Sequence, residues 1–243
     1  MGKLLVFCSG KGGVGKSTVA AAMAVAAADM GHSAILLELD AGLRCLDLML
    51  GVGDRLVFDL FDVVSAGRDA ADAAITCDKK GLLRLISAPA TQVEMDMAQV
   101  VRLAVDLTAE NDYVILDCPA GIDPELFSAL PAEAGVVVVT NPQPVPLRDG
   151  DNLRRTLAAK TSAPCFLVVN RFNLKRVKKG LDVGLDDAVD QTGIGLLGAV
   201  PEDRGVEKMD GSRFVKSRAV KACKRIIRRI EGVPTPLPRA RKI

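Results

Sequence analysis

Short runs of apolar residues recur along the whole chain, and they constrain its fold more than any other feature of the sequence. The runs are rich in Val, Ile and Leu and lack the polar alternation of a strand with one face in water. Strands that are buried on both faces, as in a parallel sheet, have this composition. The runs lie at residues 4–8, 35–39, 82–86, 113–116, 136–139, 166–169 and 196–200.

Helix-like segments separate these runs. Residues 17–30 and 93–107 have helical character, and Gly31 is well placed to end the first of the two helices. The alternation predicts the α/β class, with a doubly wound, mainly parallel sheet flanked by helices. The chain has 243 residues, enough for one large domain, which we place at residues 1–231. Three prolines preclude a continuous helix in residues 232–243, so we expect an irregular tail there.

A glycine-rich stretch, SGKGGVGKST at residues 9–18, follows the first apolar run and opens the first predicted helix. It satisfies the pattern GxxxxGK[ST], in which backbone N–H groups and the positive end of the helix bind phosphate oxygens. Lys16 would reach the β- and γ-phosphates, and the Ser17 hydroxyl would bind Mg²⁺. A turn without a ligand is the alternative, which the position between strand and helix disfavours. The predicted nucleotide contacts here are Gly10, Lys11, Gly12, Gly13, Val14, Gly15, Lys16, Ser17 and Thr18.

Lys11 is a second lysine in the same loop, five residues before Lys16. A side chain at this position points away from the phosphates that its own backbone binds. It is either a solvated surface lysine or a group that acts on a nucleotide held by a second subunit. In the second case it would stabilise charge on the transferred phosphoryl group, as an arginine finger does, and hydrolysis would depend on dimerisation.

The motif KGGVGKST resembles the deviant Walker A loop of the MinD/ParA family of P-loop ATPases, in which the early lysine is the signature. The resemblance covers roughly residues 3–210 and is strongest to the members that determine the septum site. It implies a P-loop NTPase fold, ATP and Mg²⁺ as ligands, and a homodimer in which Lys11 contacts the partner's ATP. The other matching stretches are LDAGLRCLDLMLG (39–51), RLVFDLFDVV (55–64), LDCPAGI (116–122), TNPQPVPLRDGD (140–151) and GAVPEDRGV (198–206).

Two aspartates follow predicted strands beside the phosphate loop. An aspartate at the carboxyl end of a strand can orient an attacking water, and the resemblance makes Asp40 the first-switch residue that does so. Asp117 reads as the Walker B residue that would hold Mg²⁺ opposite Ser17. A turn or helix cap is the alternative for each. Family members usually have an aspartate two positions before Asp40, where this chain has Glu38, whose longer side chain would shift the geometry around Mg²⁺.

Two further loops are candidates for base recognition, because family members place adenine between loops of this kind. An Asn amide can pair with adenine, and an arginine plane can stack on it. Strand-end turns without a ligand are the alternative. The candidate residues follow two of the apolar runs and are Asn170, Arg171, Pro201 and Asp203.

The charge of the chain is unevenly distributed. From Arg213 to the end there are eleven Lys and Arg and one acidic residue, whereas the chain as a whole has a net charge of only +2. Residues 215–230, VKSRAVKACKRIIRRI, have an apolar face and an opposite basic face, which is typical of a helix packed on a sheet with its charges in solvent. The same face could bind an anionic membrane or DNA. The basic side chains of this predicted face are Lys221, Lys224, Arg225, Arg228 and Arg229.

We therefore expect an ATPase that dimerises on ATP, hydrolyses it slowly with Lys11, Lys16 and Asp40, and acts in placing the division site. The resemblance implies other Min-system proteins as partners. Six cysteines without a CxxC pair indicate free thiols in the cytoplasm. The protein could also bind peripherally to the anionic inner face of the cell membrane. A ParA-like partition ATPase that binds DNA and a flagellar-number regulator are the alternatives. An iron–sulfur carrier is disfavoured, since paired cysteines are lacking.

Overall fold

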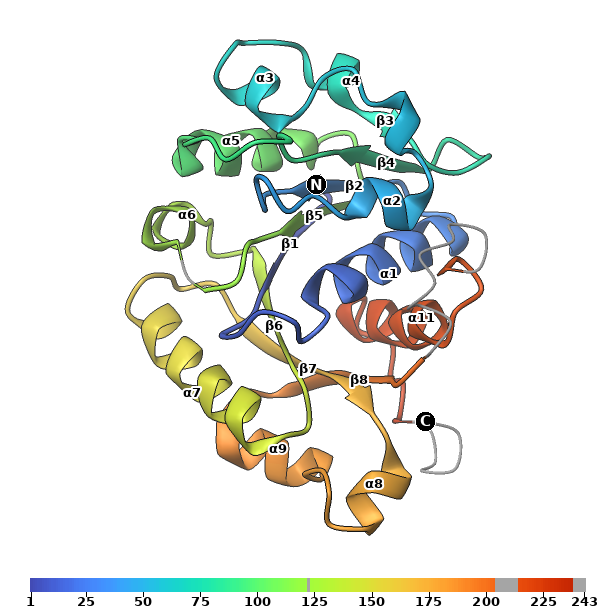
Figure 1. Ribbon diagram of the computed structural model, residues 1–243, viewed down its shortest axis with the longest axis vertical. Helices are drawn as coiled ribbons and strands as arrows, with labels where there is room; N and C mark the ends of the chain where they lie inside the picture. The colour runs from blue at the N-terminus through green and yellow to red at the C-terminus, as the bar shows by residue number, and fades with distance from the viewer. Residues whose placement is uncertain (122, 204–213, 238–243) are drawn as a thin grey trace.

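The computed structural model describes residues 1–121, 123–203 and 214–237. They form an eight-stranded sheet in the order β3-β4-β2-β5-β1-β6-β7-β8, with helices on both faces (Figure 1). Every neighbouring pair of strands is parallel except β3–β4. The predicted doubly wound, mainly parallel sheet is confirmed. The strands are β1 (Lys3–Cys8), β2 (Ala34–Glu38), β3 (Ile75–Thr76), β4 (Leu83–Ile86), β5 (Tyr113–Asp117), β6 (Gly135–Thr140), β7 (Cys165–Phe172) and β8 (Leu196–Pro201).

Each of the seven apolar runs coincides with a strand of this sheet. The central strands β2, β5 and β6 are buried along their whole length, as their unbroken apolar composition requires. The short antiparallel strand β3 was not predicted, because two residues give no periodic signal.

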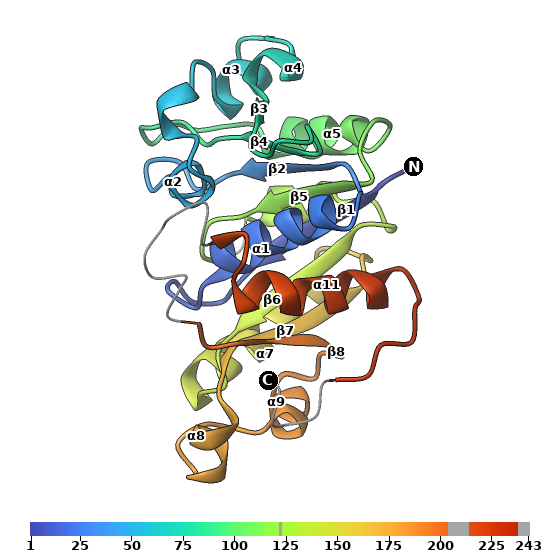
Figure 2. The same ribbon diagram turned by 90° about the vertical axis from the view of Figure 1, so that its right-hand side faces the viewer.

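Two layers of helices cover the sheet. Helices α1, α2 and α11 pack on one face, and the other helices pack on the opposite face or at its margins (Figures 1 and 2). Each face has its own apolar core, because successive side chains of a strand point to opposite sides. The helices are α1 (Lys16–Asp29), α2 (Leu46–Leu50), α3 (Leu60–Val64), α4 (Ala70–Ala73), α5 (Met97–Leu107), α6 (Pro124–Ala129), α7 (Pro144–Ala158), α8 (Leu174–Lys178), α9 (Leu185–Thr192) and α11 (Arg218–Ile230), with a 3₁₀ turn at Gly53–Arg55.

Side-chain caps set the starts of two predicted helices later than the periodicity suggested. The predicted helix 93–107 begins only at Met97, because the Asp96 carboxylate accepts a hydrogen bond from the Gln99 N–H. The predicted basic helix begins at Arg218, because the Ser217 hydroxyl accepts from the Val220 N–H. Residues 215–217 therefore precede the helix.

Helix α11 lies against β8 and beside α1 (Figure 2). A glycine permits its close approach, since a Cβ atom at Gly198 of β8 would lie 2.5 Å from Cγ1 of Ile226. Lys224 pairs with Asp29 at the end of α1, at 2.9 Å. Lys224 was predicted to lie on the solvated basic face, and its side chain is 37% exposed while it makes this pair.

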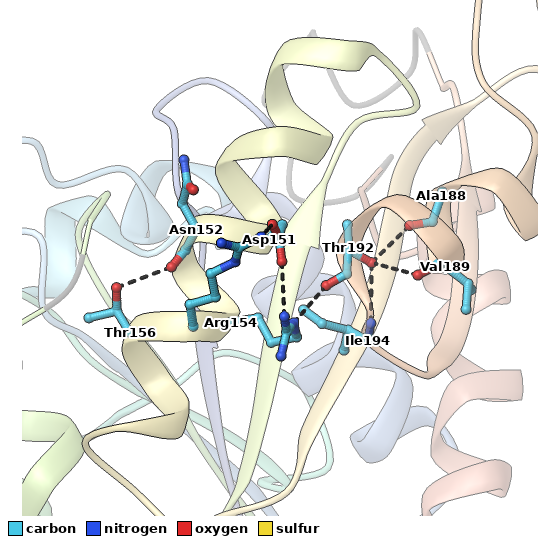
Figure 3. Close-up of polar contacts among 9 residues, drawn as sticks. Asp151, Asn152, Arg154, Thr156, Ala188, Val189, Thr192 and Ile194 are labelled. Carbon is cyan, nitrogen blue, oxygen red and sulfur yellow. Dashed lines mark hydrogen bonds and ion pairs between the residues drawn. The ribbon is translucent and has the colours of Figure 1, made fainter.

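Helix α7 contains the end of the matching stretch 140–151 and is fixed to α9 (Figure 3). The Arg154 Nε donates to the Thr192 carbonyl oxygen at 3.0 Å, and its Nη2 donates to Asp151 Oδ1 at 3.1 Å. The Thr192 hydroxyl donates to the Ala188 carbonyl oxygen at 2.8 Å. The bond from Arg154 to Thr192 therefore joins α7, the helix that follows β6, to α9.

Some predicted features lie partly outside the described residues, namely residue 122 of the stretch 116–122, residues 204–206 of the stretch 198–206 and residues 238–243 of the tail. Residues 231–237 contain no helix or strand. Across the described ranges, none of the helices is both long and apolar enough to span a bilayer. All six cysteines are free thiols.

Candidate nucleotide site

The predicted phosphate and carboxylate residues meet at the carboxyl ends of three neighbouring strands. Strand β1 lies between β5 and β6, and the connection from β1 to β2 passes over β5. Ligands of open α/β sheets bind where the strand order changes in this way. Residues 9–15 follow β1, Asp117 ends β5, and Asp40 follows β2. The sheet order thus brings together residues that are about a hundred positions apart in the chain.

The backbone of the phosphate loop requires glycine at two positions. Gly15 has a φ of 85°, in the left-handed region, and a Cβ atom there would lie 2.4 Å from Nδ2 of Asn170. A Cβ atom at Gly10 would lie 2.6 Å from the carbonyl oxygen of Asp149. The loop then enters α1, whose first turn presents unpaired N–H groups and the positive end of the helix dipole. Such a loop can bind phosphate oxygens.

Lys16 and Asp117 form a buried ion pair, with 2.6 Å between Nζ and Oδ1. The ammonium group also lies 3.3 Å from the hydroxyl of Ser17. Burial raises the pKa of the Asp117 carboxyl, and the Lys16 charge opposes that rise. Lys16 therefore contacts the carboxylate, and a bound triphosphate would compete for its ammonium group.

The second oxygen of Asp117 fits a magnesium site. Oδ2 is buried and has no hydrogen-bond partner in the part of the chain that the structure describes. An orphaned carboxylate oxygen beside a serine hydroxyl is the oxygen donor set that Mg²⁺ prefers when it also binds phosphates. Asp117 and Ser17 would hold the ion, which would neutralise charge on the phosphates.

Lys11 and Asp40 lie on the accessible side of the site. The Lys11 side chain is exposed, while its carbonyl oxygen accepts a hydrogen bond from the Ser9 hydroxyl at 3.0 Å. Asp40 is half-buried and lines a cleft of about 600 Å³ together with Pro119 and Asp123. The segments that follow β2 and β5 therefore line the same cleft.

Asn170 joins the predicted base loops to the phosphate loop. Its side chain is buried, and Nδ2 donates to the Val14 carbonyl oxygen at 2.8 Å. The exposed Arg171 has a φ of 54°, and no other non-glycine residue among those described has a positive φ. The pairing of β7 with β8 is irregular at this point. Strained backbone of this kind is often retained at ligand sites. The adenine contacts of both residues stay predictions.

The other two base candidates lie at and just after the end of β8. Pro201 pairs with Phe172 at the end of β8. Asp203 Oδ2 accepts a hydrogen bond from the Arg218 N–H at 2.6 Å, in the first turn of α11. Asp203 therefore connects the predicted base-binding loop to the basic helix, a role that sequence reasoning missed because the two segments are 15 residues apart.

Glu38 makes contacts that the sequence analysis did not predict. Its carboxylate is fully buried and accepts hydrogen bonds from protein groups through both oxygens. It therefore contacts the segment that carries Asp40, and its effect on the geometry around Mg²⁺ stays a prediction.

Comparison with known proteins identifies the family of the chain. The model of the family described as the CobQ/CobB/MinD/ParA nucleotide binding domain matches residues 5–213. The septum site-determining protein MinD of Bacillus subtilis is 37% identical over 247 residues, covering 98% of this chain and 92% of that protein. The protein of the same name from Synechocystis is 32% identical over 246 residues, covering 97% and 92%.

A solved structure extends the similarity to three dimensions. A chain of the MinC:MinD cell division protein complex of Aquifex aeolicus superposes with a TM-score of 0.84 at 30% identity, covering 98% of this chain and 99% of that one. The resemblance stated from the sequence is confirmed. The chain belongs to the CobQ/CobB/MinD/ParA family of nucleotide-binding domains, and within it to the septum site-determining MinD proteins.

Proposed function

We propose that the chain is a MinD-type ATPase, which binds ATP with Mg²⁺, hydrolyses it to ADP and phosphate, and acts as a switch in placing the division site. The observation that supports this proposal best is the group formed by Lys16, Ser17 and Asp117 behind a glycine loop. Family membership supplies the division role. The MinC:MinD complex of Aquifex aeolicus makes a MinC-type protein the natural candidate for a partner.

Each residue of the site would have a separate role in binding or hydrolysing ATP. On ATP binding, Lys16 would leave Asp117 and contact the β- and γ-phosphates, and Asp117 with Ser17 would hold Mg²⁺. The loop amides would bind the phosphate oxygens. Asp40 would orient the attacking water, because it follows the carboxyl end of β2, at the edge of the sheet where the phosphate loop and Asp117 also lie.

Dimerisation would complete the site. Lys11 is exposed, so its ammonium group is accessible to a second copy of the chain. A cation from the partner would stabilise charge that develops on the transferred phosphoryl group. The monomer would lack this charge, and hydrolysis would therefore be slow and dependent on the dimer.

Two lysine variants test the proposal. We expect Lys16→Ala to lose tight ATP binding, and Lys11→Ala to bind ATP as a monomer but neither dimerise nor hydrolyse it. The measurements are binding of a fluorescent ATP analogue, size-exclusion chromatography with ATP, and phosphate release. Lys79→Ala, at another exposed lysine, serves as the control with normal values. Normal hydrolysis by Lys11→Ala would exclude the role across the interface.

The exposed cations of α11 suggest how the dimer would reach a surface. Lys221 and Arg228 are exposed on the outer side of the helix. Each cation near an anionic bilayer contributes about 1 kcal/mol, and a dimer presents two such faces at once. We propose peripheral binding to the anionic inner face of the cell membrane when ATP is bound. DNA is the competing surface, and the charge variants described in the Discussion distinguish the two.

A further inference from the structure

Glu38 is the last residue of β2, and its carboxylate is held by four donors. Oε1 accepts from the N–H groups of Cys45, at 2.7 Å, and Leu46, at 3.0 Å. Oε2 accepts from the Ser87 hydroxyl at 2.9 Å and from the Ala88 N–H at 3.4 Å. The residue has an exposed fraction of 0%. A buried carboxylate is tolerated when its oxygens are satisfied in this way.

These contacts close the segment that contains Asp40 into a ring. The chain leaves β2 at Glu38, passes through residues 39–44 and returns to the Glu38 side chain at Cys45 and Leu46. Two backbone bonds hold the ring from outside: Leu39 N–H donates to the Asp117 carbonyl oxygen at 2.9 Å, and Gly42 N–H donates to that of Pro89 at 3.1 Å. Ring closure by a fixed group reduces the number of conformations that the loop can adopt.

Helix α2 depends on the same carboxylate. It has only five residues, and its N-cap residue, Cys45, makes no side-chain capping bond. So short a helix has little stability of its own and relies on tertiary contacts. The Glu38 oxygen supplies the cap from the neighbouring strand and thereby fixes where the switch segment ends.

We propose that Glu38 is the positioning residue of the first switch segment, a clasp that joins both ends of residues 38–46 to the loop after β4 and so holds Asp40 in place. This inference rests on the proposed role of Asp40. Both oxygens of Glu38 accept hydrogen bonds from the chain itself, so its contacts in this structure are with protein donors. An aspartate is one methylene shorter, so we expect it to lose the contact with either the start of α2 or Ser87.

Three substitutions of Glu38 separate this role from a charge effect at the metal. Glu38→Gln keeps the length and an acceptor for the α2 amides, whereas Glu38→Asp keeps the charge and loses the reach. We expect Glu38→Asp and Glu38→Ala to lower kcat about tenfold or more, with Glu38→Gln less affected, since small displacements of a catalytic group have effects of this size. KM for ATP and the Mg²⁺ concentration at half-maximal activity should stay unchanged.

Hydrogen exchange provides a readout that does not require hydrolysis. The amides of Cys45 and Leu46 should lose protection in Glu38→Asp and Glu38→Ala in the nucleotide-free protein. Ser87→Ala removes one donor only and should show a smaller change in the same direction, which keeps the test valid if a Glu38 variant fails to fold. Asp112→Asn is the matched control, because Asp112 holds Ser33 at the opposite end of β2. Its kcat and the protection of Cys45 should be normal.

The possible results are distinct. An order in which Glu38→Asp keeps more activity than Glu38→Gln, together with a shift in the Mg²⁺ requirement, would overturn the clasp and assign Glu38 to the metal. Lost protection with an unchanged kcat would also overturn it, since the clasp would then not position Asp40. Asp40→Ala is measured in parallel: full activity of that variant would refute the proposed function of Asp40, while the exchange data would still report on the clasp.

Discussion

Helices α1 and α11 lie side by side on the same face of the sheet, yet they are built differently (Figure 2). In α1 every side chain from Val19 to Ala28 is buried, and most of them are alanine. In α11 the buried side chains alternate with cations such as Lys221 and Arg228, which are exposed. The first helix has no polar face, and the second has an apolar face and a basic one.

The difference follows from their neighbours. Helix α1 packs on the central strands β2 and β5 and has α2 and α11 as neighbours, so apolar atoms surround it, and a helix that is apolar on all sides must be buried. Alanine side chains are short, so these neighbours can approach the backbone of α1 closely. Helix α11 packs on β8 and on α1, and its remaining side needs no apolar face. Therefore α1 can do no more than present its N-terminus to the phosphates, whereas α11 has a surface left for a partner.

The largest expected effect is at the buried face of α11. Ile227 is fully buried between this helix and the core. Ile227→Ala should lower the free energy of unfolding by about 2–5 kcal/mol, because it removes buried methylenes and leaves a cavity. Urea unfolding monitored by circular dichroism measures this change. A loss below about 1 kcal/mol would mean that α11 is not an integral layer of the fold.

The next effect concerns the tight packing of α1. Ala24 is fully buried. Ala24→Leu should lower the free energy of unfolding by about 1–3 kcal/mol, because the added carbons have no space in the fully buried surroundings of α1. Ala158→Leu, at an exposed position of α7, is the control and should change the stability little. Equal stability of the two variants would contradict the close packing inferred for α1.

The smallest effect distinguishes two adjacent arginines of α11. Arg229 donates from Nη1 to the Leu197 carbonyl oxygen at 2.6 Å and from Nε to that of Thr235 at 2.7 Å, and burial lowers the pKa of its guanidinium. Arg229→Gln should cost about 1 kcal/mol of stability, as for a lost hydrogen bond. Arg228→Gln should stay within about 0.5 kcal/mol, because Arg228 is exposed.

The same pair tests the proposed surface. With ATP, Arg228→Gln combined with Lys221→Gln should abolish co-sedimentation with anionic vesicles, whereas Arg229→Gln should retain most of it. Neutral vesicles and the ADP-bound protein serve as controls. If the double variant still binds vesicles fully but no longer shifts DNA, the surface is nucleic acid and the chain acts as a partition ATPase.

The predicted strands and the phosphate loop agree with the structure because each depends on neighbouring residues. An apolar run such as 136–139 must be buried whatever its partners are, and GxxxxGK[ST] needs only a strand before it and a helix after it. The boundaries of helices were less accurate, since the caps at Asp96 and Ser217 depend on one hydrogen bond each. The basic face was overestimated at Arg229, because its guanidinium donates to two carbonyl oxygens of the chain.

The sequence by itself determined the class of the fold, the nucleotide loop and the carboxylates that follow β2 and β5, because these features are local patterns of burial, glycine and charge. Only the tertiary structure decided what the polar side chains do. Asn170 supports Val14 across 156 positions, and Glu38 joins Ser87 to α2 across 49. Such partners depend on which strands become neighbours in the sheet. That order emerges when the buried faces pack together, and no short stretch of sequence records it.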